Sequence, residues 1–281
     1  MARVVGVHGI AQQVMGPETL AARWVPALRD GVTLSGSVPP ERSDVVIAFY
    51  GDIFRTPGGK ALGEPNYTAE HVDDPLEREL LELWWAEAAR ADPAVTGPDE
   101  KTKLRTPWVV QRALNALSQS KFFAALGERM IIALLKQVHA YLTDDRIHEG
   151  VQRRLVEAVE SDTAVLVGHS LGSVVAYEAV CAHPEWPVSL VTLGCPLGIR
   201  NIVFDRLRPA PVNERGVFPA GARSWTNVAD RGDVVALVKS LQPLFGDGVA
   251  DILVNNGAKA HDVSPYLTAV ETGRVIASAL A

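Results

Sequence analysis

The sequence predicts an α/β protein with a mainly parallel, doubly wound sheet. Short apolar runs rich in valine, leucine and isoleucine alternate with helical patterns along most of the chain. Several of these runs carry no charge, as expected of strands that are buried on both faces. One run passes directly into a helix at a serine between two glycines. Strand–helix–strand units of this kind build parallel sheets.

Six runs have the pattern of strands, and four segments have helical spacing of their apolar residues. The strand runs span residues 3–9, 44–51, 163–169, 188–194, 222–228 and 249–255. The helical segments span residues 18–31, 145–160, 171–182 and 265–280. Because helices separate most successive strands, we expect the strands to lie parallel. An irregular stretch at 197–221 is expected at the sheet edge where open α/β sheets carry their binding loops.

The alternation stops between residues 52 and about 142. A Gly/Pro-rich stretch, RTPGGKALGEPNY, is followed by helical patterns around DPLERELLELWWAEAARA, PWVVQRALNALSQ and ERMIIALLKQVHAYL. We interpret this part as a helical insertion, and a candidate cap, within a single domain spanning 1–281. Its apolar side chains would either bind an apolar ligand or pack within the insertion itself. They include Trp108, Phe122, Phe123, Ile131 and Leu135.

Charge and hydropathy exclude two classes of partner. The formal net charge is −6 and the pI is about 5.7, so no overall positive field exists to attract nucleic acid. The most apolar segment, FFAALGERMIIALLKQVHAYL, is interrupted by Glu128, Arg129 and Lys136, which argues against a transmembrane segment. The opening MARVVGVHG enters a strand pattern at once and leaves no room for a signal peptide, so we expect a cytoplasmic protein.

Cysteine usage argues against a disulfide framework or a structural metal. Cys181 and Cys195 are the only cysteines, and they form no C-x-x-C pair. Neither lies in a cluster with the spacing of metal ligands. We therefore expect neither a disulfide framework nor a structural zinc; no other metal and no cofactor are expected either.

Ser170 is the strongest candidate for a functional residue. In TAVLVGHSLGSVVAYEAV, residues 163–180, it lies between Gly168 and Gly172 where the strand pattern changes to a helical one. A sharp strand-to-helix turn crowds the backbone, and glycines on either side remove the Cβ atoms that would clash. The serine is then presented at the carboxyl edge of the sheet beside free helix N–H groups, which is the geometry of a nucleophile. The G-x-S-x-G pattern alone is a modest signal, and the strand-turn-helix context makes it specific.

A serine nucleophile needs a base, and imidazole has a suitable pKa near neutrality. Of the seven histidines, only His183 and His261 follow Ser170 in the chain. His183 ends the helix that follows the serine, roughly 20 Å along its axis at 1.5 Å per residue. His261, in the loop NNGAKAHDVSPYL, is therefore the expected base. By position alone, a solvated loop histidine would look the same.

An imidazole base also needs a carboxylate at its other nitrogen. The segment SWTNVADRGDVVAL offers two, Asp230 and Asp233, at the end of a predicted strand. Asp230 could instead cap the following turn. The chain order serine, aspartate, histidine is that of α/β-hydrolases, and it differs from the chymotrypsin-like and subtilisin-like orders.

Three motifs together resemble a known superfamily. GHSLGSVVAYEA, GDVVAL and HDVSPYL are similar to the nucleophile, acid and histidine motifs of lipases and esterases in the α/β-hydrolase superfamily. Fungal-type triacylglycerol lipases and GPI-inositol-deacylase-like hydrolases are closest in character. The resemblance covers the sheet and its motifs but not residues 52–142. In these families the acid directly precedes an aliphatic pair, which implies Asp233, before Val234 and Val235.

Acyl transfer also needs N–H donors for the tetrahedral oxyanion. The backbone N–H of Leu171, directly after the candidate nucleophile, is one expected donor. The segment VHGIAQQ resembles the His-Gly-x oxyanion loop of lipases, which implies the Ile10 N–H as the second donor and a loop-ordering role for His8. Without the resemblance, His8 and Gly9 indicate only a tight turn after a strand.

The expected function is that of a serine hydrolase acting on carboxylic esters, in which Ser170, His261 and Asp233 form a catalytic triad and an acyl-enzyme is the intermediate. Small-molecule esters, lipid-like ones among them, are the expected substrates. Thioesterases, peptidases or amidases and acyltransferases share such a triad and differ in their pockets. A non-catalytic binding module on the same fold is the candidate from another class.

Overall fold

The structure is a computed structural model that describes residues 3–55, 67–98, 106–120, 123 and 127–281. The chain divides into two compact units. The first combines Met1–Ile53 with Glu149–Ala281, and the second is Phe54–His148. The described residues form six strands and nine α-helices.

The first unit contains a six-stranded, all-parallel sheet, which confirms the predicted α/β class. The strand order is β2-β1-β3-β4-β5-β6. The strands are β1 (Arg3–Val7), β2 (Val45–Ala48), β3 (Thr163–His169), β4 (Val188–Leu193), β5 (Ala222–Asp230) and β6 (Val249–Val254). Each overlaps the run predicted for it. Every residue of β3 and β4 is buried, as their uncharged sequences require in the middle of a parallel sheet.

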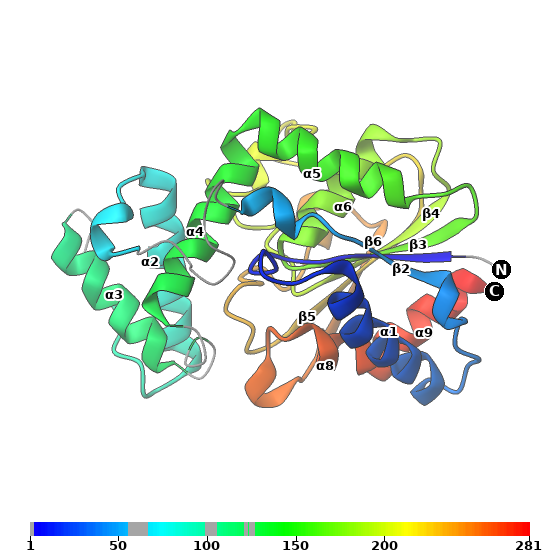
Figure 1. Cartoon of the computed structure of the whole chain (residues 1–281), viewed down its shortest axis with the longest axis horizontal. Helices are drawn as coiled ribbons and strands as arrows, with labels where there is room; N and C mark the ends of the chain where they lie inside the picture. Colours follow the sequence, from blue (N-terminus) through cyan, green and yellow to red (C-terminus); the bar gives the residue numbers. More distant parts are fainter. Residues whose placement is uncertain (1–2, 56–66, 99–105, 121–122, 124–126) are drawn as a thin grey trace. The chain divides into compact units, whose positions relative to one another are not determined.

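Helices cover both faces of this sheet. They are α1 (Pro17–Leu34), α5 (Asp145–Ala158), α6 (Leu171–Ala182), α7 (Gln242–Phe245), α8 (Val263–Thr268) and α9 (Val270–Leu280). In Figure 1, α1, α8 and α9 lie on one face, and α6 with the part of α5 after residue 148 lies on the other. The core between α1, α9 and the sheet includes Trp24, Leu28, Val165, Val191 and Ile276.

The predicted helix 265–280 is instead two helices. Ala269 has an extended backbone (ψ 132°) and separates α8 from α9. The break lets both helices approach α1 closely: a Cβ on Gly31 would lie 2.0 Å from the Leu267 carbonyl oxygen, and a Cβ on Gly273 would lie 1.9 Å from that of Gly31. The apolar pattern continues across Ala269, so this tertiary requirement left no signal in the sequence. The first of the two helices, α8, begins two residues after His261.

The second unit is helical, like the insertion that the sequence predicts. Its complete helices are α2 (Pro75–Ala91), α3 (Pro107–Gln119) and α4 (Glu128–Thr143). Most of the Gly/Pro-rich stretch at 55–67 lies outside the described residues, as does Phe122. The other apolar side chains of the insertion that the sequence offers for ligand binding differ in exposure: Phe123, Ile131 and Leu135 are buried, and Trp108 is 71 % exposed.

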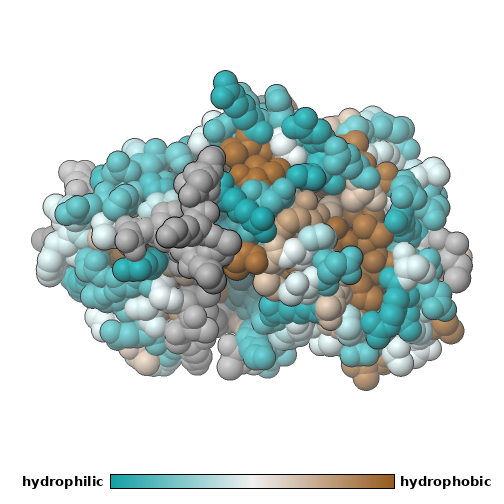
Figure 2. Space-filling model, in the orientation of Figure 1, coloured by the Kyte–Doolittle hydropathy of each residue, from teal (hydrophilic) through white to brown (hydrophobic). Residues whose placement is uncertain are grey.

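None of the helices in the described ranges combines the length and hydropathy needed to span a bilayer. Figure 2 shows hydrophobic residues reaching the surface at several places among mainly hydrophilic ones. Scattered apolar exposure of this kind is usual on protein surfaces.

Candidate active site

Ser170 occupies a strained position between β3 and α6. Its φ of 55° and ψ of −129° lie in the left-handed half of conformational space that favours glycine. Two hydrogen bonds hold it there: its N–H donates to the Leu193 carbonyl (3.0 Å), and its carbonyl accepts from the Ser173 N–H (2.9 Å). Strain of this type costs about 1–3 kcal/mol and tends to persist where function requires it.

Glycines make this turn possible. A Cβ on Gly168 would lie 2.6 Å from the Ser173 Cα, and one on Gly172 would lie 2.2 Å from the Val7 carbonyl oxygen. A Cβ on Gly9, in the loop after β1, would lie 2.9 Å from the Ser170 Cβ. The turn therefore packs directly against the end of β1, and the loop that follows β1 lies beside the serine.

The structure brings Ser170, His261 and Asp233 into one chain of hydrogen bonds. The Ser170 Oγ lies 3.1 Å from the His261 Nε2, and the His261 Nδ1 lies 2.8 Å from the Asp233 Oδ2. A carboxylate only accepts hydrogen bonds, so the Nδ1 carries the hydrogen and the Nε2 lone pair is free to accept from the serine hydroxyl. The three residues follow β3, β5 and β6, and so meet at the carboxyl edge of the sheet.

The Asp233 carboxylate is fully buried but well supplied with donors. Its Oδ2 accepts from the Tyr266 hydroxyl (2.8 Å) as well as from His261, and its Oδ1 accepts from the N–H groups of Val235 (2.8 Å) and Ala236 (3.3 Å). Burial acts to raise the pKa of Asp233, but His261 and these hydrogen bonds outweigh it and hold the pKa below its usual value. The His261 side chain is 27 % exposed, whereas Asp233 and Ser170 are both buried.

Asp230 has a different set of partners. Its Oδ1 accepts from the Gly232 N–H (2.7 Å), and its Oδ2 accepts from the N–H of Asn256. It therefore ties the turn that carries Asp233 to the loop that leads to His261. Of the two carboxylates that the sequence offered, Asp233 is the one paired with His261.

His183 lies at the C-terminal end of α6, away from Ser170. Its ring stacks on Trp186 with centroids 4.2 Å apart, and its Nδ1 donates to Glu185 (2.9 Å). The helix geometry that excluded it in the sequence is the geometry observed.

Leu171 and Ile10, the expected oxyanion donors, lie on the two segments next to Ser170. Leu171 is the first residue of α6, and Ile10 follows Gly9 in the loop packed against the serine. Within the described residues, the structure gives neither backbone N–H a hydrogen-bond partner. Neither amide is committed to another described group of the chain.

His8 fixes the peptide that carries the Ile10 N–H. The Tyr50 N–H donates to the His8 Nε2 (3.1 Å), which leaves the hydrogen on Nδ1, and the Nδ1 donates to the Gly9 carbonyl (2.6 Å). In a planar trans peptide the N–H points opposite to the carbonyl, so this bond also orients the Ile10 N–H. Burial lowers the pKa of His8 to about 4, which keeps the ring neutral near pH 7. These two hydrogen bonds tie His8 to the loop that carries Gly9 and Ile10.

Sequence reasoning gave no role to Tyr266 or to His169. The Tyr266 hydroxyl donates to Asp233 and accepts from the Asp230 N–H (2.8 Å). Tyr266 lies five residues after His261 in the HDVSPYL segment, on the short helix α8 that Asp262 caps. An aromatic residue one helical turn after this cap could have suggested a side chain that points into the protein. His169 packs its ring against that of His261.

Replacing Tyr266 with phenylalanine is expected to lower kcat about tenfold and the free energy of unfolding by about 1–3 kcal/mol. The variant removes one donor from Asp233 and leaves the Asp230 N–H unpaired, while His261, Val235 and Ala236 still bind the carboxylate. Ester hydrolysis and chemical denaturation measure the two effects.

Tyr177→Phe is the matched control. Tyr177 is also buried, and its hydroxyl donates to the Val217 carbonyl (2.8 Å) rather than to Asp233. It should lose stability without loss of kcat. A Tyr266→Phe variant with wild-type kcat would show that this hydroxyl does not act on Asp233.

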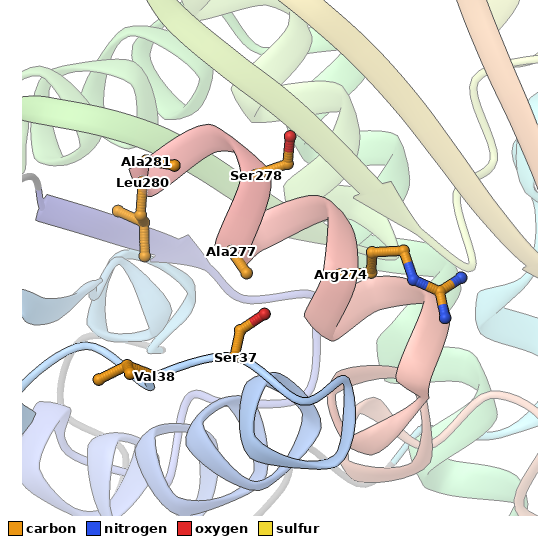
Figure 3. A pocket seen from close by; sticks show the side chains of 7 residues that line it. All are labelled: Ser37, Val38, Arg274, Ala277, Ser278, Leu280 and Ala281. Atoms are coloured by element: carbon orange, nitrogen blue, oxygen red, sulfur yellow. The ribbon is translucent and has the colours of Figure 1, made fainter.

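Pockets elsewhere in the first unit contain none of the three side chains. One of about 460 Å³ lies between α9 and the segment after α1, lined by residues that include Ser37, Val38 and Arg274 (Figure 3). Another, of about 530 Å³, borders Arg231 and Asn256. Within the described ranges, no group of three or more His, Cys, Asp or Glu residues is arranged to hold a metal ion.

Comparison of the sequence with models of known protein families gives no match, and comparison with curated proteins gives none. Function must therefore be inferred from the site itself.

Proposed function

We propose that this chain is a serine hydrolase of the α/β-hydrolase type that cleaves carboxylic esters. The hydrogen-bonded chain from Ser170 through His261 to Asp233 is the observation that carries this proposal. The strained turn at Ser170 supports it, because a serine that serves only packing has no need of such a backbone.

Acylation begins with proton transfer from the Ser170 hydroxyl to the His261 Nε2. The Oγ attacks the ester carbonyl carbon as the proton leaves, and the carbonyl oxygen becomes an oxyanion. The carbonyl then re-forms, the bond to the alkoxy group breaks, and His261 returns the proton to the departing alcohol. Asp233 stabilises the imidazolium between these two transfers.

Deacylation repeats the sequence with water. His261 takes a proton from a water molecule, whose oxygen attacks the acyl carbon bonded to Ser170. The carboxylic acid is released and the proton returns to the serine. These steps use only side chains and amides of the chain itself.

The N–H groups of Leu171 and Ile10 are the proposed oxyanion donors. A preorganised donor of this kind contributes about 10²–10³-fold to kcat. The hydrogen bonds that His8 makes to the Gly9 carbonyl and accepts from the Tyr50 N–H hold the second donor in place before substrate binds.

Other acyl transfers share this arrangement. A thioesterase, a peptidase or amidase, and an acyltransferase would use the same three side chains and differ in leaving group or acceptor. A non-catalytic binding module would have no need for an imidazole aligned between a serine and a buried carboxylate. That alignment favours an enzyme over a binding module.

A fluorophosphonate probe tests the enzymatic proposal directly. We expect stoichiometric labelling of the intact protein, with the adduct found on Ser170 by mass spectrometry, because the probe needs an activated serine. Absence of labelling would reject the proposal and favour the binding module.

A substrate panel tests the reaction class. p-Nitrophenyl butyrate, a butyryl thioester and butyryl p-nitroanilide share one acyl group and differ in the bond that is broken. The highest kcat/KM is expected for the ester. Faster turnover of the thioester or the anilide would replace the esterase proposal with a thioesterase or an amidase.

A further inference from the structure

We propose that His169 is a positioning residue for this reaction, holding the backbone and ring of His261 so that its Nε2 faces Ser170. The inference rests on the proposed function, because it assigns His261 as the base. His169 is the last residue of β3 and directly precedes Ser170.

Two contacts join His169 to His261. The His169 Nε2 lies 2.9 Å from the His261 backbone carbonyl oxygen, and since a carbonyl only accepts, the Nε2 carries the hydrogen and donates it. The two rings also pack together, with centroids 4.8 Å apart and planes 33° apart. Two consecutive residues at the end of β3 therefore have different parts in the site: Ser170 is the candidate nucleophile, and His169 binds the backbone of the candidate base, His261.

His169 is itself held in a fixed position. It is buried, its ring is nearly perpendicular to that of Trp24 with centroids 6.5 Å apart, and the centroid of the Tyr266 ring lies 6.1 Å away. Because the central strand fixes its backbone and neighbouring rings restrict its side chain, it offers a rigid reference for a loop residue.

The other anchors of the His261 loop act on neighbouring residues. Asp262 caps α8 through the Ser264 N–H (2.8 Å), and Arg23 of α1 binds the Asp262 carboxylate. Asn256 is tied to Asp230. These contacts act beside His261. The peptide that joins His261 to Asp262 is held at both groups: its N–H donates to the Lys259 carbonyl within the loop (2.9 Å), and its carbonyl accepts from His169 at the end of the central strand β3.

The ionisation of His169 suits this role. Burial, together with the nearby His261, lowers its pKa to about 3 despite Asp233 and Asp262 close by. A neutral ring does not repel the imidazolium that forms on His261 during acylation. A ring with so low a pKa is a weak base near pH 7, so His169 does not act as a second base.

Two amide substitutions test the role with closely matched chemistry. In His169→Gln the amide nitrogen falls near the position of the imidazole Nε2 and can still donate to the His261 carbonyl. In His169→Asn the amide nitrogen falls nearer the Nδ1 position and cannot reach it. His169→Leu removes the donor and keeps an apolar side chain.

We expect His169→Asn and His169→Leu to lose about 10²-fold in kcat for p-nitrophenyl butyrate and in the rate of fluorophosphonate labelling, with KM changed less than about twofold. The His169→Gln variant should be at least tenfold faster than the asparagine and leucine variants in both measurements. A purely structural role would instead lower the fraction of protein that can be labelled and leave the rate per labelled site unchanged. His183→Leu, at the far end of α6, is the control and should match the wild type.

The outcomes separate the two proposals. If the wild type neither labels nor hydrolyses esters, the proposed function fails and the role of His169 fails with it. If the wild type is active and the asparagine variant reacts as fast as the glutamine variant, the proposed function stands and the positioning role is rejected. Should the leucine variant fail to fold, the glutamine–asparagine pair alone decides the matter.

Discussion

Ser170→Ala is expected to lower kcat by about 10⁶-fold and to abolish covalent labelling. The reason is that, among the residues the structure describes, Ser170 carries the one hydroxyl paired with the His261 Nε2. Alanine is smaller than serine, and among the described residues the Ser170 Oγ is hydrogen-bonded only to His261, so the variant should fold as the wild type does. Turnover of p-nitrophenyl butyrate and circular dichroism measure the two properties.

His261→Ala should be similarly damaging, because the serine is then left without a base. Groups that act as one unit are non-additive, so the double variant Ser170→Ala/His261→Ala should be no slower than either single variant. His183→Ala is the matched control, since that imidazole is engaged with Trp186 and Glu185. An active Ser170→Ala protein, or equal losses at the two histidines, would reject the mechanism.

The fold was largely predictable because its signals are local. A parallel sheet buries its central strands on both faces, so uncharged runs such as 163–169 and 188–194 locate β3 and β4 without further information. The division of 265–280 into α8 and α9 was not predictable, because the close approach of α1 through Gly31 and Gly273 decides it. Those two glycines are far apart in the sequence.

Some residues of the candidate site could likewise be predicted from the sequence, and others could not. Ser170 and Leu171 belong to one continuous strand-turn-helix segment, so the sequence locates them directly. His261 followed from elimination of His183 by helix length. The contacts of Tyr266 and His169 depend on which way buried side chains point after the segments meet, and spacing along the chain does not carry that information.

The two candidate aspartates could not be distinguished by their position in the sequence. Asp230 and Asp233 are three residues apart at the end of one strand, so position alone leaves both open. The turn rotates one carboxylate toward His261 and the other toward the backbone of Gly232 and Asn256. Only the resemblance to hydrolase motifs favoured Asp233 in advance.

Asp233→Asn is expected to lower kcat by about 10⁴-fold. An asparagine amide can donate to the His261 Nδ1, which stabilises the tautomer with its hydrogen on Nε2. That tautomer has no lone pair facing the Ser170 hydroxyl. The low pKa of Asp233 means that the wild-type carboxylate is ionised at neutral pH, so the variant also removes the negative charge that stabilises the imidazolium.

Asp230→Asn provides the contrast, because it changes the same kind of residue on the same turn. Its carboxylate accepts from two backbone N–H groups and does not contact His261, so the free energy of unfolding should fall by about 1–3 kcal/mol while kcat of the folded protein stays within about tenfold. Steady-state kinetics on folded protein, with denaturation curves for both variants, separates the two effects. A kcat about 10⁴-fold lower in Asp230→Asn, together with a kcat within about tenfold of the wild type in Asp233→Asn, would assign the catalytic acid to Asp230. That outcome would contradict the pairing of Asp233 with His261, because loss of the partner at Nδ1 must affect the imidazole more than loss of a carboxylate that binds only the neighbouring backbone.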